Sequence, residues 1–299
     1  MRIGQTESCK KYIIFTADDM GRSPSVNAAV AQAHTGGVLN SSSIMAAGEA
    51  FEEAVQMARN FPGLSAGIHV TLCDGRSVLP HSQIPDLVNE QGEFEKSPAI
   101  AGIRYWRKRK EKPFCAQMEA EIEAQFSRLQ EAGIHPTHVD SHHHLHVHPV
   151  IFRMVCRIAA RRGVEWIRMP LEPAASLPGG FFFTRTAEWG AFLILKSINA
   201  KVARGFGLNY AGGTGGLSRM GDSGVQALLK LARFAKGPVA EIYSHPDLST
   251  ERGRRELESL RSSAVANALA EFNAVSEGYK KAPKRYKILE GKRACAPEK

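Results

Sequence analysis

Seven of the eleven histidines of this chain fall between His135 and His148, in the sequence HPTHVDSHHHLHVH. Neutral imidazole is a common protein ligand for divalent metal ions, and Asp140 places a carboxylate in the same segment. The cluster therefore predicts a metal site. Adjacent side chains on a strand point to opposite faces, so this segment alone does not make a site, and the alternative is a polar, solvated loop.

Three further candidates lie nearer the N-terminus. Asp18 and Asp19 follow the apolar run YIIFT, and His69 lies within LSAGIHVTL. Two carboxylates at the turn out of a strand can divide two tasks, because one can bind a metal ion while the other accepts a proton. One carboxylate with two histidines leaves coordination positions open for water and substrate, as in catalytic sites. The alternatives are a helix cap for the aspartates and a core position for His69.

Predicted strands and helices alternate around these residues. Short apolar runs predict strands, helical spacing predicts helices between them, and this alternation implies parallel strands with helical crossovers. The candidates fall at predicted strand ends, as do Arg168 and His245, and such ends carry the active site in parallel α/β folds. We predict an α/β fold, a single (β/α) TIM-like barrel that is distorted or has fewer than eight strands. The predicted strands are 12–16, 41–46, 64–72, 137–140 and 165–169, and the predicted helices are 25–36, 50–60, 114–133 and 149–163.

The barrel is expected to span residues 12–279, after a polar lead-in at 1–11 that does not resemble a signal peptide. Insertions are expected near 74–113 and 181–220, and a basic, disordered tail at 280–299. The apolar segment 181–203 is either a core helix or an element that covers the site or touches an apolar ligand. The glycine-rich segment YAGGTGGLSRMG lacks the lysine and the spacing of a P-loop and is expected to be a mobile lid or substrate loop.

The cysteine content, the length of the apolar runs and the net charge indicate where the protein is located and which partners it can bind. The five cysteines form no CxxC pair, which favours a reducing compartment, and no apolar run reaches the roughly 18 residues of a membrane span. We therefore expect a cytoplasmic protein. The net charge of +9 can attract nucleic acid or an anionic membrane. No nucleic-acid motif or aromatic stacking platform accompanies the basic residues, so we expect no nucleic-acid partner. Peripheral contact with the inner membrane face and oligomer formation stay open.

Four motifs occur together in one order: TADDMG, GIHVTL, THVDSHHHLHVHP and SHPD. In this combination, over roughly residues 12–250, the chain resembles the YdjC-like carbohydrate deacetylases, which include chitooligosaccharide deacetylases. The apolar insertion and the basic tail resemble most the hopanoid-biosynthesis-associated branch, HpnK. The resemblance implies hydrolysis of the N-acetyl group of an amino sugar, on a hopanoid-type glycolipid or a chitooligosaccharide. Acetate is released, and the cofactor is one divalent ion, zinc or magnesium.

The resemblance also implies roles for individual residues. By position in the motifs, Asp19, His69 and His142 correspond to the metal ligands of the family. Asp18 corresponds to the general base, and His245 of SHPD to the general acid. Within the histidine cluster, His143 and His144 stay alternatives to His142 as the ligand.

The remaining site residues are expected to bind substrate or to orient the ligands. Arg168 is expected to keep Asp18 charged, and Asp140 lies beside the predicted ligands in sequence. His144 and His146 alternate with His142 and share its face if that segment is extended.

The main alternative function is another metal-dependent barrel enzyme that acts on sugars or phosphoesters, namely an isomerase or a phosphoesterase. An isomerase usually needs more carboxylates and a lysine near the metal ion, and Glu241 and Asp247 are the few spare candidates.

Overall fold

The computed structural model describes residues 11–170, 195–216, 224–234 and 238–284. Its strands form one sheet in the order β5-β4-β3-β2-β1-β7-β6, with β8 paired to the first residues of β1, and each strand pairing of this sheet is parallel. The strands are β1 (Lys11–Met20), β2 (Ser41–Ile44), β3 (Ser65–Val70), β4 (His138–Ser141), β5 (Trp166–Ile167), β6 (Gly213–Gly216), β7 (Val239–Ser244) and β8 (Ala274–Ser276).

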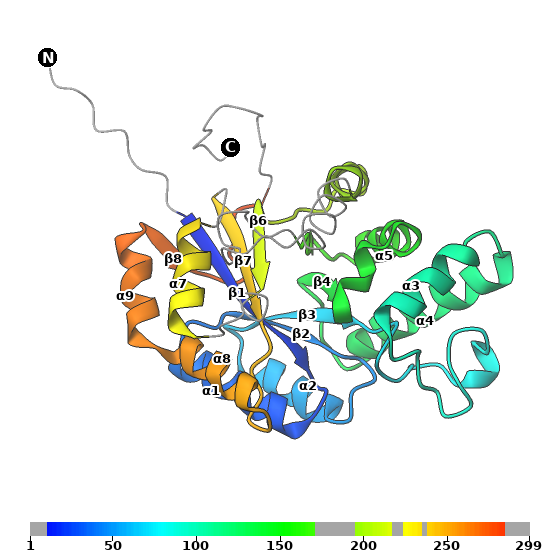
Figure 1. The fold of residues 1–299 in the computed structure, drawn as a ribbon, viewed down its shortest axis with the longest axis horizontal. Coiled ribbons are helices and arrows are strands. Elements are labelled where there is room, and N and C mark those ends of the chain that lie inside the picture. Colours follow the sequence, from blue (N-terminus) through cyan, green and yellow to red (C-terminus); the bar gives the residue numbers. More distant parts are fainter. Residues whose placement is uncertain (1–10, 171–194, 217–223, 235–237, 285–299) are drawn as a thin grey trace, which may run out of the picture.

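The two edges of this sheet approach each other. An isolated parallel bridge joins Trp166 of β5 to Asn209, shortly before β6. The Ile167 backbone N–H donates to the Asn209 carbonyl at 2.9 Å, and the Asn209 N–H donates to the Glu165 carbonyl at 2.8 Å. The sheet therefore curls into a distorted parallel barrel (Figure 1), with seven strands of the described residues on the path from β5 to β6, and this confirms the predicted fold class.

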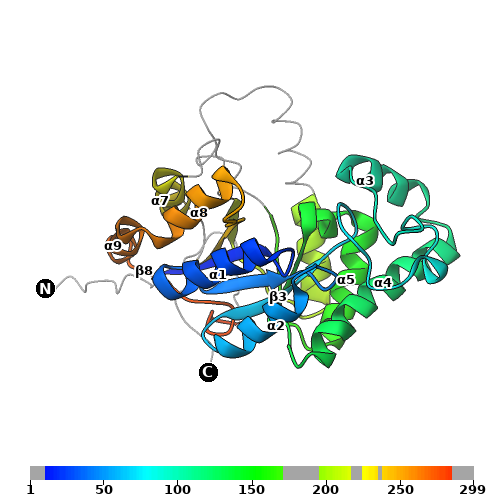
Figure 2. The same cartoon turned by 90° about the horizontal axis from the view of Figure 1, so that it is seen from below.

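Helices connect the strands and cover the outside of the sheet (Figures 1 and 2). The four helices predicted from the sequence correspond to α1, α2, α4 and α5. Ser23 caps α1 by accepting a hydrogen bond from the Val26 N–H, and Pro24 opens that helix. The helices are α1 (Pro24–Gly36), α2 (Phe51–Asn60), α3 (Pro98–Arg107), α4 (Lys112–Glu131), α5 (Pro149–Arg161), α7 (Val225–Phe234), α8 (Glu251–Arg261) and α9 (Ser263–Glu271), with short 3-10 helices η1 (His81–Gln83) and η2 (His142–Val147).

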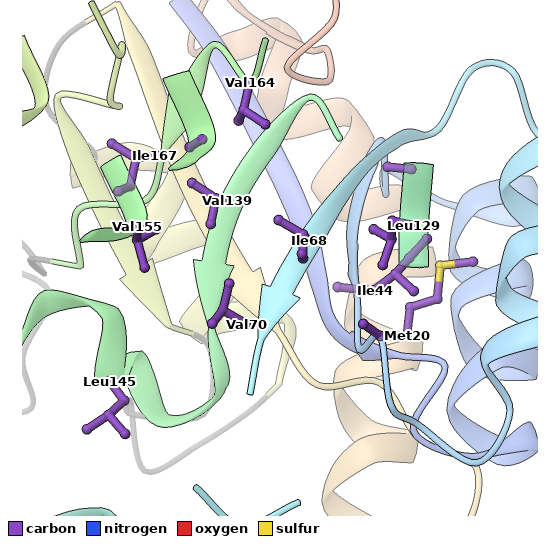
Figure 3. Close-up of a cluster of buried hydrophobic side chains, with 14 of the residues drawn as sticks. Met20, Ile44, Ile68, Val70, Leu129, Val139, Leu145, Val155, Val164 and Ile167 are labelled. Carbon is purple, nitrogen blue, oxygen red and sulfur yellow. The ribbon is translucent and has the colours of Figure 1, made fainter. Parts of the chain in front are cut away.

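A row of buried apolar side chains crosses the sheet and explains which residues face the barrel interior. The members of this row stand in register on consecutive strands and share one core cluster with side chains of α4 and α5 (Figure 3). Successive side chains of a strand alternate between its faces, so the next residues, His69, Asp140 and Arg168, point into the barrel. The row consists of Met20, Ile44, Ile68, Val139 and Ile167.

The glycine-rich segment was expected to be a mobile lid, and the structure corrects this expectation. Residues Gly213–Gly216 form β6, a buried strand paired with β7. The glycines serve close packing, because a Cβ atom on Gly216 would lie 2.3 Å from the Tyr243 ring. A run of glycines is more typical of a loop than of a strand, so the sequence pattern favoured the wrong structure here. Residues 217–221 of this segment lie outside the described residues.

The two predicted insertions differ in how much of them is described. Residues 74–113 contain η1 and α3, and α4 begins at Lys112. Of the apolar segment 181–203, only 195–203 is described, and it belongs to a helix at 195–205. Residues 1–10 of the lead-in and 285–299 of the tail also lie outside the described residues. In the described part of the chain, no helix is long and apolar enough to cross a membrane.

Candidate active site

The end of β1 turns two consecutive carboxylates toward one site. Between the pairings Ala17–Ser42 and Met20–Ile44, β1 contains one residue more than β2, so the strand bulges. Asp19 adopts a left-handed backbone with φ of 65°. This bulge breaks the alternation that would send the two aspartates to opposite faces, and Asp18 and Asp19 line the same cavity.

The three predicted metal ligands lie together. Asp19 Oδ1 is 3.1 Å from His69 Nε2 and 2.9 Å from His142 Nδ1. All three side chains are buried, and one ligand atom of each lies within 4.8 Å of the others. On the other side of the His69 ring, Nδ1 is 2.8 Å from Asp140 Oδ1. A carboxylate that accepts a hydrogen bond from the far ring N–H of a histidine ligand fixes the tautomer and the orientation of the ring.

Burial and these contacts shift the pKa values of Asp19 and His69 in opposite directions. Burial alone would raise the pKa of Asp19, but the contacts with His142 and His69 outweigh it and hold the pKa well below its usual value. Burial alone would lower the pKa of His69, but the charge of Asp140, the hydrogen bond to Asp140 and the close contact with Asp19 raise it to about 10. Without a metal ion, His69 is therefore a protonated ring between two carboxylates at neutral pH.

Arg168 is the centre of a charge cluster inside the barrel. Its fully buried guanidinium donates to both oxygens of Asp18, at 2.6 and 2.7 Å. Its Nη2 also lies 2.7 Å from Asp140 Oδ2, and its Nε donates to Glu241 Oε1 at 2.9 Å. A planar guanidinium has five N–H donors and can serve several carboxylates at once. Arg168 thus contacts Asp18 as expected, although three strands of the sheet separate β5 from β1, because both side chains extend into the barrel interior.

The cluster contains more carboxylates than cations, and the pKa values reflect this. Burial would raise the pKa of Asp140, but the positive charges of Arg168 and His69 lower it below the usual value. At Glu241 burial outweighs the effect of Arg168, and the pKa is raised. Among these two acidic groups, Glu241 is therefore the one that takes up a proton more readily.

The segment after β4 is a 3-10 helix, and this overturns the argument that placed three histidines on one face. That argument required an extended backbone from His142 to His146. His143 and His144 instead have left-handed φ values of 54° and 55°. His142 therefore faces Asp19, while His143 and His144 also line the cavity and His143 is the more exposed of the two.

His146 is fully buried and does not line the cavity. Its Nδ1 lies 2.7 Å from Ser141 Oγ, and its Nε2 lies 2.9 Å from the Arg168 carbonyl oxygen. Burial lowers the pKa of His146 to about 4, so the ring is neutral at pH 7. A neutral ring can accept from Ser141 and donate to Arg168, and His146 therefore supports the backbone that carries Arg168 rather than contacting substrate.

The sequence did not indicate Asp74 and Arg22, which contact the predicted ligands. Asp74 Oδ2 lies 3.4 Å from His142 Nε2 and 3.3 Å from His143 Nε2. Arg22 donates to Asp19 Oδ2 at 3.2 Å and lies 3.8 Å from Asp74 Oδ2. Both residues follow strand ends, so the rule that pointed to His69 could have found them. Asp74 reaches its position with a left-handed φ of 47°, which sequence spacing does not predict.

Helix α4 holds the loop that carries Asp74. Gln125 accepts from the Thr71 N–H at 2.9 Å and donates to the Thr71 carbonyl at 2.8 Å. Further along this loop, buried Glu121 accepts from the N–H groups of Val78 and Leu79, each at 2.9 Å. These four hydrogen bonds hold the loop at Thr71 and at Val78 and Leu79, on both sides of Asp74, and thereby place Asp74 beside the histidines.

The candidate ligands and catalytic residues line one cavity of about 860 Å³, within the usual size range of small-molecule sites. His245, just after β7, has its Nε2 3.7 Å from Asp18 Oδ2, and its side chain is 39% exposed. The Glu256 carboxylate accepts from the His245 backbone N–H at 2.6 Å and fixes this turn. The other walls come from Tyr243 of β7 and from residues at or just before the starts of α1, α3 and α8, which include Ser23, Val26, Pro98, Ser249 and Thr250.

The donor set suits a divalent ion. Asp19 Oδ1 and His69 Nε2 are buried, and neither has a hydrogen-bond partner of acceptable geometry. One carboxylate oxygen and two imidazole nitrogens are typical ligands of zinc and similar ions. Asp19, His69 and His142 could therefore hold a metal ion.

Two overlapping groups also have ligand atoms within 4.8 Å of one another. The group of Asp18, His69 and Asp140 surrounds the positive charge of Arg168, which opposes a second cation. The other group, Asp74 with His142 and His143, is more exposed.

The fold and the site define a parallel α/β barrel with a candidate metal centre at the carboxyl ends of its strands. Residues 12–271 match the family model described as YdjC-like protein, and the chain belongs to this family.

Two relatives of this chain are named carbohydrate deacetylases. One, from Brevibacillus brevis, is 30% identical over 237 residues, which cover 78% of this chain and 80% of the relative. The other, from Geobacillus stearothermophilus, is 40% identical over 164 residues. That match covers 54% of this chain and 60% of the relative. A chitooligosaccharide deacetylase of Salmonella paratyphi B is 34% identical over 157 residues, or 52% of this chain and 58% of the relative.

A solved structure supports the fold. The crystal structure of a "putative cellobiose-phosphate cleavage protein" from Enterococcus faecalis V583 aligns with a TM-score of 0.70 at 24% identity. The alignment covers 91% of this chain and 98% of that protein. These comparisons confirm the predicted family and carry no information on the hopanoid-associated branch.

Proposed function

We propose that this chain is a metal-dependent carbohydrate deacetylase, which hydrolyses the N-acetyl group of an amino sugar and releases acetate. The observation that carries the proposal is the convergence of Asp19, His69 and His142 beside Asp18 and His245 in one cavity. The relatives named carbohydrate and chitooligosaccharide deacetylases support the same reaction class.

In this proposal Asp19, His69 and His142 hold one divalent ion. When bound, such an ion polarises an amide carbonyl and lowers the pKa of water at the site. The two imidazole nitrogens favour zinc, and magnesium is the alternative. The hydrogen bond between His69 and Asp140 leaves His69 Nε2 to face the ion.

Asp18 is the proposed general base. Arg168 holds both of its oxygens, so the carboxylate has one orientation at the wall of the cavity. It takes one proton from the attacking water, whose oxygen forms the new bond to the acetyl carbon. His245 lies next to Asp18 and is half-exposed to the cavity, which suits a group that donates a proton to the departing amine as the C–N bond breaks.

We further propose the finer assignments that the sequence suggested. The substrate is an N-acetylglucosaminyl glycolipid of the hopanoid type or a chitooligosaccharide, and the enzyme works in the cytoplasm at the inner face of the membrane. The apolar segment 181–203 and the basic surface support a lipid-linked sugar, whereas the named relatives support a chitooligosaccharide.

An isomerase is less well supported. Glu241 is held by Arg168, and Asp247 accepts hydrogen bonds from Ser25 and Ser249. No lysine of the described residues lines the cavity. The spare carboxylates and the lysine that an isomerase would use are therefore not in place.

The decisive experiment measures acetate release and metal content together. N,N'-diacetylchitobiose and N-acetylglucosaminyl hopanoid are the two substrates, each with and without a chelator. We expect Asp18→Asn to lose activity and to keep its metal ion, and Asp19→Ala and His69→Ala to lose both. His143→Ala is the matched control in the histidine cluster and should retain the ion.

Two results would remove the proposal. One is full activity in Asp18→Asn, and the other is unchanged metal content in Asp19→Ala. Isomer formation from the same sugars without acetate would favour the alternative function.

A further inference from the structure

The outward face of α3 carries exposed apolar side chains. Ile100, Ile103 and Trp106 are 56%, 61% and 48% exposed, and they are three of the four exposed large hydrophobic residues in the described part of the chain. With about 3.6 residues per turn, they share one face of the helix with exposed Arg107. The opposite face buries Tyr105 in the core. α3 lies at the periphery of the molecule in both views (Figures 1 and 2).

The same segment holds much of the positive charge of the chain. Residues 96–112 contain seven basic residues and one acidic residue, Glu111, which leaves an excess of six positive charges against +9 for the whole chain. Lys108 pairs with Asp86 at 3.0 Å, but Arg107 and Lys110 are exposed on the outer side. An apolar face flanked by cations is typical of a helix that lies in the interface of an anionic membrane.

We propose that α3 and the basic residues that follow it dock this protein on an anionic lipid surface. The isoleucines and Trp106 enter the boundary between headgroups and acyl chains, and Arg107 and Lys110 contact the headgroups. Pro98, the first residue of α3, lines the cavity of the candidate active site. The docked helix therefore holds the mouth of this cavity next to the membrane surface. The proposal depends neither on the deacetylase reaction nor on the hopanoid-associated branch.

The surface chemistry favours lipid over nucleic acid or a second copy of the chain. Binding of single-stranded nucleic acid uses aromatic faces for stacking, but the Arg109 guanidinium lies over the Trp106 ring, 4.2 Å from its centre. The middle of the outward face is aliphatic rather than polar, because it consists of Ile100 and Ile103. Two copies joined through this face would bring equal positive charges together, which opposes association.

Cosedimentation with lipid vesicles tests the docking surface. We expect the full chain to bind vesicles of phosphatidylcholine with phosphatidylglycerol, to bind pure phosphatidylcholine far less, and to dissociate as salt is raised. Arg107→Gln with Lys110→Gln should lower the partition coefficient about 25-fold, or about fivefold for each cation. Ile103→Ser should also lower it.

The chain offers matched controls on other surfaces. Lys201→Gln with Arg255→Gln removes the same charge from two exposed positions elsewhere, and Ile198→Ser removes an apolar side chain that is 53% exposed on the helix at 195–205. Both should keep the partition coefficient of the unchanged chain. Equal losses in test and control variants would overturn the proposal. So would equal binding to both vesicle types, no binding to either, or preferential capture of RNA or a second copy through α3.

The same variants separate this proposal from the proposed function. Ile103 and Arg107 do not line the cavity, so acetate release from soluble N,N'-diacetylchitobiose should not change in their variants. If no variant and no parent protein releases acetate, the proposed function fails, while vesicle binding still reports on α3.

Discussion

Replacing Arg168 by methionine tests the charge cluster on which the candidate site rests. The substitution keeps an unbranched side chain and removes the cation that Asp18, Asp140 and Glu241 share at 2.6–2.9 Å. Removing one partner of a buried ion pair costs about 3–5 kcal/mol, because the other charge is left without compensation. Arg168 is fully buried and has three such partners, so we expect a loss of about 5 kcal/mol at neutral pH.

The loss should depend on pH with a definite sign. In the unchanged protein, the charges of Arg168 and His69 outweigh burial and lower the pKa of Asp140. A carboxylate with a lowered native pKa stabilises the fold above its unfolded pKa, near 3.9, and loses this contribution as the pH falls through the native value. Without Arg168, burial dominates at Asp140 and raises its native pKa, and the pKa of Glu241, which burial already raises, rises further.

The native variant then binds more protons than its unfolded chain, so its stability falls as the pH rises. The gap in the free energy of unfolding between the two proteins should therefore be largest at about pH 8 and narrow toward about pH 5. Urea unfolding followed by circular dichroism, in the presence of a chelator, measures this gap. Arg157→Met is the matched control, because Arg157 pairs with Glu119 at 2.6 Å on the surface and is 46% exposed. We expect its effect to stay within about 1 kcal/mol.

A gap that stays constant over this pH range would refute the reasoning, since it would show that the native carboxylates do not titrate in response to Arg168. Equal losses in Arg168→Met and Arg157→Met would refute it as well, because burial would then make no difference to the value of the ion pair.

Asp74 and two buried histidines give two further predictions. Asp74→Ala removes the acceptor beside His142 Nε2, so we expect the metal affinity measured by calorimetry to fall by about 10-fold or more. Asp74→Asn keeps an acceptor oxygen and should recover part of this affinity. An unchanged affinity in Asp74→Ala would contradict the prediction. Burial lowers the pKa of His138 to about 3 and that of His146 to about 4. As the pH falls below about 6.5, the unfolded chain takes up protons on these histidines before the native state does, so the free energy of unfolding decreases. By about pH 4, each histidine should have lowered it by about 3 kcal/mol. An acid titration of stability that stays flat from about pH 6.5 to about pH 4 would contradict this second prediction.

The sequence predicted the parts of the site that follow from the alternation of strands and helices. In a parallel barrel the carboxyl ends of the strands lie on one side. This rule brought Asp18, His69, Arg168 and His245 to one place, although they lie far apart in the chain. It works because the strands of a parallel sheet run in one direction, so that their carboxyl ends meet at one edge.

The parts that the sequence could not predict depend on local departures from regular backbone. The prediction that His146 shares the face of His142 required an extended backbone. It was wrong because His143 and His144 adopt left-handed conformations, which no pattern of residue types in that segment specifies. β6 was missed because its glycines accommodate the Tyr243 ring rather than a turn. Asp74 was missed because its position depends on hydrogen bonds between its loop and α4.

The balance of charge explains how one barrel interior can contain both Arg168 and a site for a divalent ion. Without the ion, His69 carries the proton that neutralises part of the charge of Asp19 and Asp140, and its pKa near 10 keeps that proton in place. A divalent ion held by Asp19, His69 and His142 would take the place of the proton on His69 Nε2, while the Nδ1–H of His69 would keep its hydrogen bond to Asp140. Arg168 approaches Asp140 and Asp18 from inside the barrel, and Arg22 approaches Asp19 from the rim. Neither arginine occupies the space between Asp19 and the two histidines, so that space could hold a divalent metal ion.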